Sequence, residues 1–205
     1  EICACLVGSE MCIRDRKRTT DFIIAGMCLV VFSPLMLICA LCIRWEDGLP
    51  VIYKQERIGL HGKPFYIYKF RSMRIDAEKD GPDLLEIKGD PRLTKVGRFL
   101  RAHHLDELPQ LWNVFKGDMS FIGPRPERKF YIDQIMEHDS RYQFLYQIRP
   151  GVTSYATLYN GYTDTMEKML RRLELDLYYL EHRSWWFDAK ILLKTFCNIA
   201  FGKKF

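Results

Sequence analysis

The sequence predicts an α+β protein, mainly helical with a small β-hairpin or sheet, that is attached to a membrane through its N-terminal part. Three observations predict this class. An uncharged apolar stretch runs from Phe22 to Ile43. Two short segments rich in aromatic and β-branched residues flank a turn with two glycines. The second half carries helical patterns, of which Met166–His182 is the strongest. With 205 residues, 48% of them apolar, the chain is long enough to bury a core.

Charge and cysteine placement restrict the partners and the compartment. The net charge of +5 suits anionic phosphates or an anionic membrane surface, and it is modest for a nucleic-acid binder. Six of the seven cysteines lie at or before Cys42, which is no disulfide framework and indicates a reducing compartment. Residues 1–16 do not have the order of regions of a signal peptide. We expect them to be a non-native or disordered leader.

Residues 17–45 are predicted to form the membrane segment. A helix over the apolar stretch would be roughly 33 Å long, enough to cross the hydrocarbon of a bilayer. Ser33-Pro34 lies in its middle, where proline frees one carbonyl, and the Ser33 hydroxyl is a candidate partner for it. Basic residues on both sides remove the charge gradient that orients a spanning helix. We expect a helix broken at Ser33-Pro34 that re-enters the membrane; a kinked spanning helix is the alternative.

A second membrane signal lies near the C-terminus. Trp185-Trp186-Phe187 opens an apolar helical pattern that continues to Ile199 with interspersed lysines. Aromatic anchors beside lysines suit a helix in the plane of the membrane interface. The alternative is an amphipathic helix packed on the core of the protein.

The remaining elements, residues 46–205, are predicted to form a catalytic domain on the cytoplasmic face, with interfacial helices. Asp106 is expected to cap the helix Glu107–Phe115, with Pro109 in its first turn and Gly117 beyond its end. The other expected elements are a hairpin from Val51–Tyr53 and Pro64–Phe70 around Gly59–Gly62, a surface loop over Asp76–Asp90, helices over Leu93–Ala102 and Glu127–Gln147, and a turn at Pro150-Gly151.

The adjacent carboxylates Asp106 and Glu107 are the candidate chemical centre. Paired carboxylates among cations suit phosphate chemistry with a divalent metal, since one can attack while the other holds the ion. Several cations precede the pair, and such a set can surround a pyrophosphate: Lys54, Arg57, Lys63, Lys69, Arg71, Arg74, Arg92, Lys95, Arg98 and Arg101. Each of these residues alone is equally compatible with a solvated surface. No P-loop, Rossmann or zinc spacing is present.

Ordered motifs along the chain match one family. The chain resembles the monotopic bacterial sugar transferases, which are small polyprenyl-phosphate phosphoglycosyl transferases. The likeness covers Lys17 to the C-terminus. The matching motifs are Lys17-Arg18-x-x-Asp21, Ser33-Pro34, Gln55-x-Arg57-Ile-Gly59, Lys69-Phe-Arg-Ser-Met73, Asp90-x-Arg92-x-Thr94-x-x-Gly97-Arg98, Leu105-Asp-Glu-Leu-Pro-Gln-Leu-Trp-Asn113, Lys116-Gly-Asp-Met-Ser120, Gly123-Pro-Arg-Pro126, Arg149-Pro-Gly151 and Asp176-x-x-Tyr179.

The resemblance implies an enzyme that moves a sugar 1-phosphate from a UDP-sugar to a polyprenol phosphate, undecaprenyl phosphate in bacteria, as the first membrane step of glycan assembly. It implies that Asp106 is the nucleophile that forms a covalent phosphosugar intermediate and releases UMP, and that Glu107 binds Mg²⁺. Lys69, Arg101 and Asp176 match family positions near the phosphates or the metal, and Arg125 is a further anion-binding candidate. The implied location is the bacterial inner membrane, with the active site on the cytoplasmic face.

One departure and two rival functions remain. Where the family often has Trp and a final Arg after Pro-Gly, this chain has Tyr155 and Tyr162, which leaves the sugar open. The first rival is a catalytically inactive scaffold of a glycan-assembly complex. The second is a nucleic-acid-binding module, which the membrane segment and the lack of reader motifs disfavour, so no nucleic acid is expected. Membrane lipid is an expected partner. The oligomeric state, a homo-oligomer included, is left open.

Overall fold

The computed structural model describes residues 2–75, 77, 92–161, 163 and 165–200. In this part of the chain the fold is mainly helical, with two two-stranded sheets. The helices are α1 (Ile2–Asp47), α2 (Lys95–Ala102), α3 (Gln110–Lys116), α4 (Lys129–His138), α5 (Tyr155–Asn160), α6 (Met166–His182) and α7 (Trp185–Ala200), with the 3₁₀ turns η1 (Leu60–Gly62), η2 (Leu105–Glu107) and η3 (Ser140–Gln147). The strands are β1 (Ile52–Ile58), β2 (Pro64–Phe70), β3 (Ser120–Ile122) and β4 (Gly151–Thr153).

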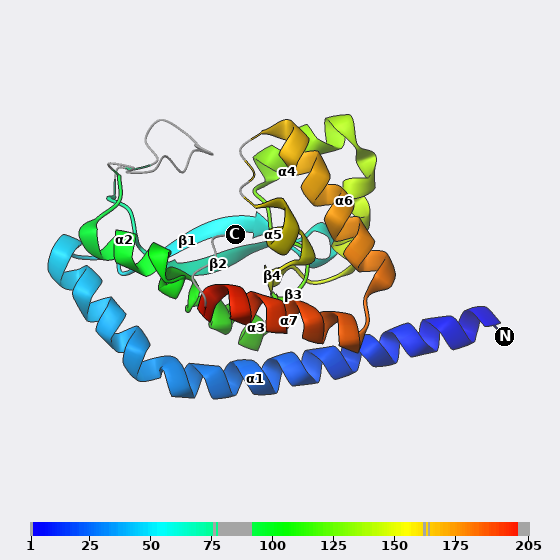
Figure 1. Cartoon of the computed structure of the whole chain (residues 1–205), viewed down its shortest axis with the longest axis horizontal. Helices are drawn as coiled ribbons and strands as arrows, with labels where there is room; N and C mark the ends of the chain where they lie inside the picture. The colour runs from blue at the N-terminus through cyan, green and yellow to red at the C-terminus, as the bar shows by residue number, and fades with distance from the viewer. Residues whose placement is uncertain (1, 76, 78–91, 162, 164, 201–205) are drawn as a thin grey trace.

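Helix α1 runs along one side of the molecule and changes direction part-way along its length (Figure 1). It is one helix with Pro34 inside it, so the predicted break at Ser33-Pro34 is wrong in one respect: the helical hydrogen bonding continues past the proline. The Ser33 hydroxyl donates to the Val30 carbonyl at 2.7 Å. This is the carbonyl that Pro34 leaves without an N–H donor, so the predicted partner is confirmed.

The apolar part of α1 is long and exposed enough to contact lipid. The helix over Arg16–Asp47 has a mean hydropathy of 2.6 in its most apolar window, and only 11% of that window is buried against the rest of the chain. Val30, Val31 and Leu37 are each more than half exposed. A solvated surface of this size is unusual for a soluble protein, because large exposed apolar patches normally mark interaction or membrane surfaces.

Both ends of this apolar segment are attached to the same folded body. At the first end, Arg18 donates to the carbonyls of Val114 and Phe115 at 2.7 and 2.8 Å, which satisfies the C-terminal carbonyls of α3. At the second end, the carboxylate of Glu46 accepts from the first backbone N–H groups of α2, at 2.7 Å from Lys95 N. Asp47 pairs with the buried guanidinium of Arg71 at 3.0 Å.

Strands β1 and β2 form the predicted antiparallel hairpin, with Tyr53 opposite Lys69 and Ile58 opposite Pro64. Helix α2 begins one residue after its N-cap, Thr94, whose hydroxyl accepts from Gly97 N at 2.9 Å. The predicted helix over Leu93–Ala102 is therefore confirmed apart from its first turn. The loop expected over residues 76–90 lies outside the described residues, apart from Ala77.

Two predictions about the middle of the chain are wrong. Asp106 does not cap a helix: it lies inside η2, and α3 begins at Gln110 after Pro109. The backbone of His104 is left-handed (φ 55°), which ends the preceding helix and starts a separate turn. Gly117 ends α3 with φ 102°, as predicted. Pro150-Gly151 is not a turn, because Gly151 begins β4, which pairs in parallel with β3.

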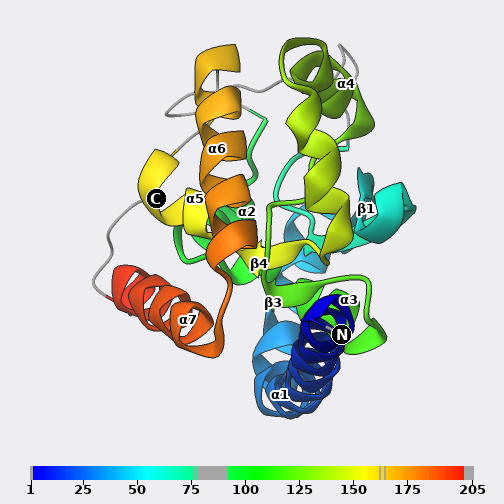
Figure 2. The ribbon, with the colours of Figure 1, turned by 90° about the vertical axis from the view of Figure 1, so that its right-hand side faces the viewer.

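Helices α4 and α6 lie on the side opposite to α1, α3 and α7 (Figure 1, Figure 2). Helix α6 matches the predicted Met166–His182, and its buried Met169 and Leu173 pack on Ile132 and Ile135 of α4. The helix predicted over residues 127–147 is divided into α4 and η3. The division is at Asp139, whose carboxylate accepts from Arg141 N and so caps η3 instead of continuing α4.

Helix α7 has one packed face and one open face. Ile191 is buried and Phe187 packs on Tyr179 of α6, whereas Trp186, Leu193 and Phe196 are 81%, 66% and 69% exposed. The helix is therefore attached to the core, as one alternative predicts, and its outer face carries exposed apolar side chains.

Candidate active site

Turn η2 carries the candidate nucleophile and its neighbour. Asp106 is buried, and Glu107 extends to Lys69 on β2, whose Nζ lies 2.6 Å from Glu107 Oε1. The two carboxylates are consecutive in a tight turn, so each senses the charge of the other. The turn thus places two carboxyl groups and one ammonium group together.

Asn113 fixes the strand that carries Lys69 against the helix that follows the carboxylates. This fully buried amide of α3 accepts from Tyr68 N at 3.0 Å and donates to Tyr66 O at 2.7 Å. Its side chain therefore acts like one residue of a neighbouring strand along the edge of β2. Lys69 follows directly, so its ion pair with Glu107 rests on this contact.

Arg101, near the end of α2, is a second cation whose charge acts on Asp106. Its Nε donates to the hydroxyl of Ser72 at 3.0 Å, and its charge lowers the pKa of Asp106. The close approach depends on Gly97, because a Cβ at that position would lie only 1.9 Å from the backbone oxygen of Ser72. Glycine thus lets α2 pack directly on the segment after β2 and directs Arg101 to the carboxylates.

The environment pushes the pKa values of the two carboxyl groups in opposite directions. Burial, and then the charge of Glu107, raises the pKa of Asp106, which the cations Lys69 and Arg101 only partly offset. Burial also acts on Glu107, but the charges of Lys69 and Arg125 outweigh it and lower its pKa to about 2. Glu107 is therefore ionised at any physiological pH, whereas burial makes the charged form of Asp106 less favourable than it would be in water.

Arg125 reaches Glu107 from the Gly123-Pro-Arg-Pro126 turn after β3. The turn is held at both ends. Gly123 N donates to Thr153 O of β4 at 3.1 Å, and a Cβ on Gly123 would lie 2.3 Å from the backbone oxygen of Arg149. Arg57 of β1 donates to Pro126 O at 3.1 Å. These contacts fix the backbone of Arg125, so its charge has a defined place beside Glu107.

Asp176 lies in a separate buried cluster on α6. Its neighbours are Arg172 and Glu127, which are bonded to each other, and Oδ1 of Asp176 has no hydrogen-bond partner among the described residues. Burial raises the pKa of Asp176 to about 8, so its carboxyl group is neutral at pH 7. Asp176 and Arg125 line the same small cavity, which places this cluster next to Arg125 and outside the group around Glu107.

The structure thus brings together five of the predicted site residues from four parts of the fold: Asp106 and Glu107 of η2, Lys69 of β2, Arg101 of α2 and Arg125 of the turn after β3. Similarity to known proteins identifies the family in which such a site occurs. The profile of the bacterial sugar transferase family matches residues 13–202. The chain belongs to the bacterial sugar transferase family.

Similar bacterial sugar transferases include enzymes named for undecaprenyl-phosphate substrates. The chain is 43% identical over 183 residues to a UDP-glucose:undecaprenyl-phosphate glucose-1-phosphate transferase of Caulobacter vibrioides, covering 88% of this chain and 68% of that protein. It is 41% identical over 181 residues to the Escherichia coli enzyme of the same name (87% and 39%). It is 40% identical over 186 residues to an N-acetylgalactosaminephosphotransferase of Aeromonas hydrophila acting on undecaprenyl phosphate (91% and 44%). The chain spans less than half the length of the last two relatives.

The carboxylates of this bacterial sugar transferase are of a type that could bind Mg²⁺ together with the phosphates of a substrate. Among the described residues no three His, Cys, Asp or Glu side chains gather around one point. Mg²⁺ does not need such a cage, because it keeps several waters and binds through one or two carboxylates together with substrate phosphates. The ionised Glu107, whose Oε1 pairs with Lys69, is a carboxylate of the type that such an ion uses.

Sequence reasoning missed two contributors to this site. His104 precedes the carboxylates and its charge lowers the pKa of both Asp106 and Glu107. Its position in the sequence, two residues before Asp106, could have identified it as a site residue. The ion cluster of Arg57, Glu127 and Arg172 holds the turn of Arg125. Its members are far apart in the sequence, and they come together only because Glu127 pairs with Arg57 of β1 and with Arg172 of α6.

Proposed function

We propose that this chain transfers a sugar 1-phosphate from a UDP-sugar to a polyprenol phosphate of the membrane, with UMP as the leaving product. The observation that carries the proposal is the buried Asp106 beside the ionised Glu107, with Lys69, Arg101 and Arg125 around them. Three cations near a buried carboxylate suit the two phosphates of a nucleotide sugar, because they offset the charge that attacking carboxylate and substrate bring together. The names of the relatives support the substrate classes.

In the first step, one carboxylate oxygen of Asp106 forms a bond to the phosphorus that carries the sugar. The bond from this phosphorus to the oxygen bridging it to the uridine phosphate breaks, and UMP leaves with the electron pair. In the second step, a phosphate oxygen of the polyprenol phosphate attacks the same phosphorus and displaces Asp106. Burial favours this role, since a poorly hydrated carboxylate is a better nucleophile once neighbouring cations keep it ionised.

Glu107 is the residue that would hold Mg²⁺, which when bound would neutralise charge on the phosphate oxygens. Lys69 holds Glu107 in place, Arg101 faces Asp106, and Arg125 faces Glu107. These cations bind and orient the phosphates whichever sugar is attached. Tyr155, at the position where the family often has Trp, packs against the rings of Tyr159 and Tyr178 in tilted geometry. Tyr162 lies outside the described residues.

The two ends of the apolar segment of α1, near Arg18 and Glu46, support the proposed membrane placement. Arg18 at one end and Glu46 at the other contact the same folded body, so a helix that crossed the bilayer would carry one contact to the wrong face. We therefore infer that residues 17–45 re-enter the bacterial inner membrane at its cytoplasmic face. Residues 46–205 then form the catalytic part, and the open face of α7 lies in the interface.

The test is UMP release from purified protein incubated with Mg²⁺, polyprenol phosphate and a panel of UDP-sugars. We expect at least one UDP-sugar to yield UMP, and mass spectrometry without the lipid acceptor to find the phosphosugar on Asp106. Asp106→Asn should lower the rate by about 10³-fold or more and remove the adduct. Asp133→Asn, an exposed carboxylate of α4, is the matched control and should keep the rate.

Two results would contradict the proposal. UMP release by Asp106→Asn at the wild-type rate would remove Asp106 as nucleophile. Failure of the wild-type protein with every UDP-sugar would leave the inactive membrane scaffold as the better description.

A further inference from the structure

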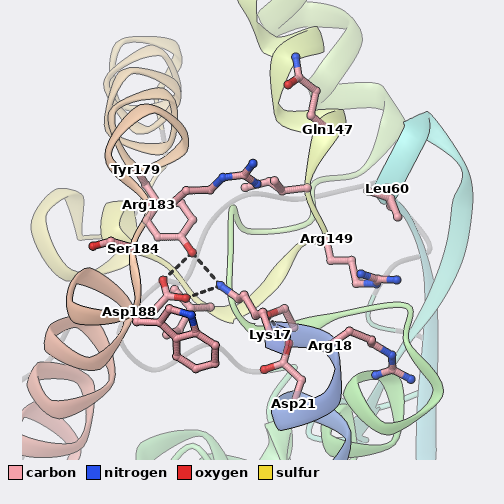
Figure 3. A pocket seen from close by; sticks show the side chains of 14 residues that line it. Lys17, Arg18, Asp21, Leu60, Gln147, Arg149, Tyr179, Arg183, Ser184 and Asp188 are labelled. Atoms are coloured by element: carbon pink, nitrogen blue, oxygen red, sulfur yellow. Dashed lines mark hydrogen bonds and ion pairs between the residues drawn. The ribbon is translucent and has the colours of Figure 1, made fainter. Parts of the chain in front are cut away.

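The two ends of the apolar segment of α1 are held at different places in the fold. Near the first end, Lys17 Nζ lies 2.6 Å from Asp188 Oδ2 and donates to the hydroxyl of Tyr179 at 2.9 Å, at the corner between α6 and α7 (Figure 3). At the second end, the carboxylate of Glu46 contacts α2, the helix that carries Arg101. The second end therefore adjoins an element of the carboxylate site.

Glu46 supplies acceptors for the start of α2 from outside that helix. Its Oε1 accepts from Lys95 N at 2.7 Å, and its Oε2 accepts from Val96 N at 2.8 Å. The next N–H group, that of Gly97, donates to the hydroxyl of Thr94 at 2.9 Å. The first N–H groups of a helix have no acceptor within the helix. A carboxylate that engages two of them with its two oxygens therefore fixes the place of this helix end, and the helix dipole favours its charge.

An apolar cluster packs the same part of α1 against the segments that carry the site residues. Its buried members from α1 are Cys39 and Ile43. Four of their partners in the cluster are adjacent in sequence to a site residue: Phe70 follows Lys69, Leu100 precedes Arg101, and Leu105 and Leu108 flank Asp106 and Glu107. Close-packed side chains transmit displacement, so a shift of this part of α1 would reach the backbone of the carboxylate site.

A second set of bonds from the end of α1 leads to the acceptor of Arg101. Asp47 pairs with the buried guanidinium group of Arg71 at 3.0 Å, and this group also donates to the carbonyls of Asp47 and Gly48 at 2.7 and 3.1 Å. The next residue, Ser72, accepts from Arg101 Nε at 3.0 Å. Both the helix that carries Arg101 and the segment that supplies its acceptor are thus bonded to the end of α1.

We propose that Glu46 is a positioning residue for the phosphate transfer: it holds α2 against the end of the membrane helix and thereby sets the place of Arg101 at the carboxylate site. The inference rests on the proposed function, because Arg101 is one of the cations assigned to the substrate phosphates. Glu46 acts through Arg101 and touches no substrate. The seating of the membrane helix and the geometry of the carboxylate site are therefore coupled.

The test is a double-mutant cycle on UMP release with Glu46→Ala and Arg101→Ala. We expect Glu46→Ala to slow UMP release by about tenfold or more, because misplacing a group that orients substrate by about 1 Å can cost about 100-fold. In a protein that already carries Arg101→Ala, the same change should slow the reaction by less than about twofold, since the residue through which Glu46 acts is gone. Glu46→Gln, which keeps the length and one acceptor oxygen, gives the same cycle with a smaller effect if Glu46→Ala does not fold.

Lys17→Gln is the matched control, because it removes an ion pair that holds the other end of the same apolar segment. Any effect of Lys17→Gln on the rate should be the same factor with Arg101 present and with Arg101→Ala. Hydrogen exchange, followed by mass spectrometry, tests the placement of α2 without turnover. Glu46→Ala should speed amide exchange in α2 and η2, whereas Lys17→Gln should leave exchange in these two elements unchanged.

Four results would overturn the proposal. The first is a folded Glu46→Ala protein that releases UMP at the wild-type rate. The second is equal slowing by Glu46→Ala with and without Arg101, which would assign its effect to stability alone. The third is a Lys17→Gln effect that also disappears with Arg101→Ala, and the fourth is unchanged amide exchange in α2. A wild-type protein that releases no UMP contradicts the proposed transferase activity instead, and the exchange measurement still decides whether Glu46 holds α2.

Discussion

Adjacent residues of the same chemical type have different roles at this site because their neighbours differ. Glu107 contacts the ammonium group of Lys69, so it is the permanently charged member of the pair. Asp106 is less exposed to solvent, and its burial and the charge of Glu107 raise its pKa against the opposite effect of Lys69 and Arg101. The division between a group that holds and a group that reacts therefore comes from β2, α2 and the turn of Arg125, and the turn η2 alone would not produce it.

Asp176 is expected to make the stability of the fold depend on pH. Its pKa is about 8 in the folded protein and near 3.8 when unfolded, so between these values the folded chain keeps a proton that the unfolded chain has lost. Stability is therefore expected to fall as the pH rises from about 4 to about 8 and then to level off. Asp176→Asn, which is neutral throughout, should reduce the difference in melting temperature between pH 5 and pH 8.

The control for this prediction is Asp133→Asn, which alters an exposed carboxylate paired with Lys129 and should keep the pH dependence of the wild type. An Asp176→Asn protein whose melting temperature changes with pH as the wild type does would show that other groups cause the effect.

At the scale of elements, the contact of α2 with the segment after β2 controls the place of Arg101. Gly97→Ala would put a methyl group into the backbone of Ser72, which has no flexible end to move away. We expect a lower melting temperature, loss of the bond between Arg101 and Ser72, and at least tenfold slower UMP release. Gly26→Ala is the matched helical control, because its Cβ would meet only the ring edge of Phe115 at 3.3 Å. Equal activity of both variants would contradict the prediction.

The elements that the sequence predicts correctly are those whose signals are local. The amphipathic pattern of α6 and the glycines between β1 and β2 identify these elements without knowledge of the rest. Gly151 was misassigned to a turn because its partner in β4 pairing, Ser120, is thirty-one residues away. Asp106 resembled a helix cap because nothing in the local sequence shows that the backbone of His104 is left-handed.

The site shows the same division. Asp106, Glu107 and the cations around them could be predicted as a set from ordered motifs. Their arrangement could not, because it depends on Asn113 binding the edge of β2 and on Arg57 binding the turn of Arg125. A motif match identifies residues that share a function in the family, but it does not show which of them lie together. Asp176 is separated from Asp106 and Glu107 because of the way α6 packs.

At the scale of the whole molecule, the bend of α1 lets its apolar segment attach to the folded body near both Arg18 and Glu46 (Figure 1). Pro34→Ala would restore the N–H donor to Val30 O and favour a straight helix. We expect part of the variant protein to span the membrane. The measurement is labelling of Trp45→Cys, in a chain whose own cysteines are replaced by serine, with a reagent that cannot enter intact cells.

With Pro34 present, the cysteine at position 45 should be protected in intact cells and react after lysis. With Pro34→Ala, a measurable fraction should react from outside. Leu37→Ala, an exposed apolar residue of the same segment, serves as control and should behave as the parent protein. External labelling of the protein that retains Pro34 would exclude re-entry.

The bonds from Arg18 to the end of α3 have a consequence for how this chain can be divided or recombined. The membrane helix supplies donors that complete the helix directly following the two carboxylates, and Ala25, Cys39 and Ile43 of the same helix are part of the buried core. Deleting the anchor would expose both the carbonyls and the core. A soluble, active version should therefore require redesign of α3 and its surroundings, and replacing α1 with an unrelated membrane helix should not restore activity.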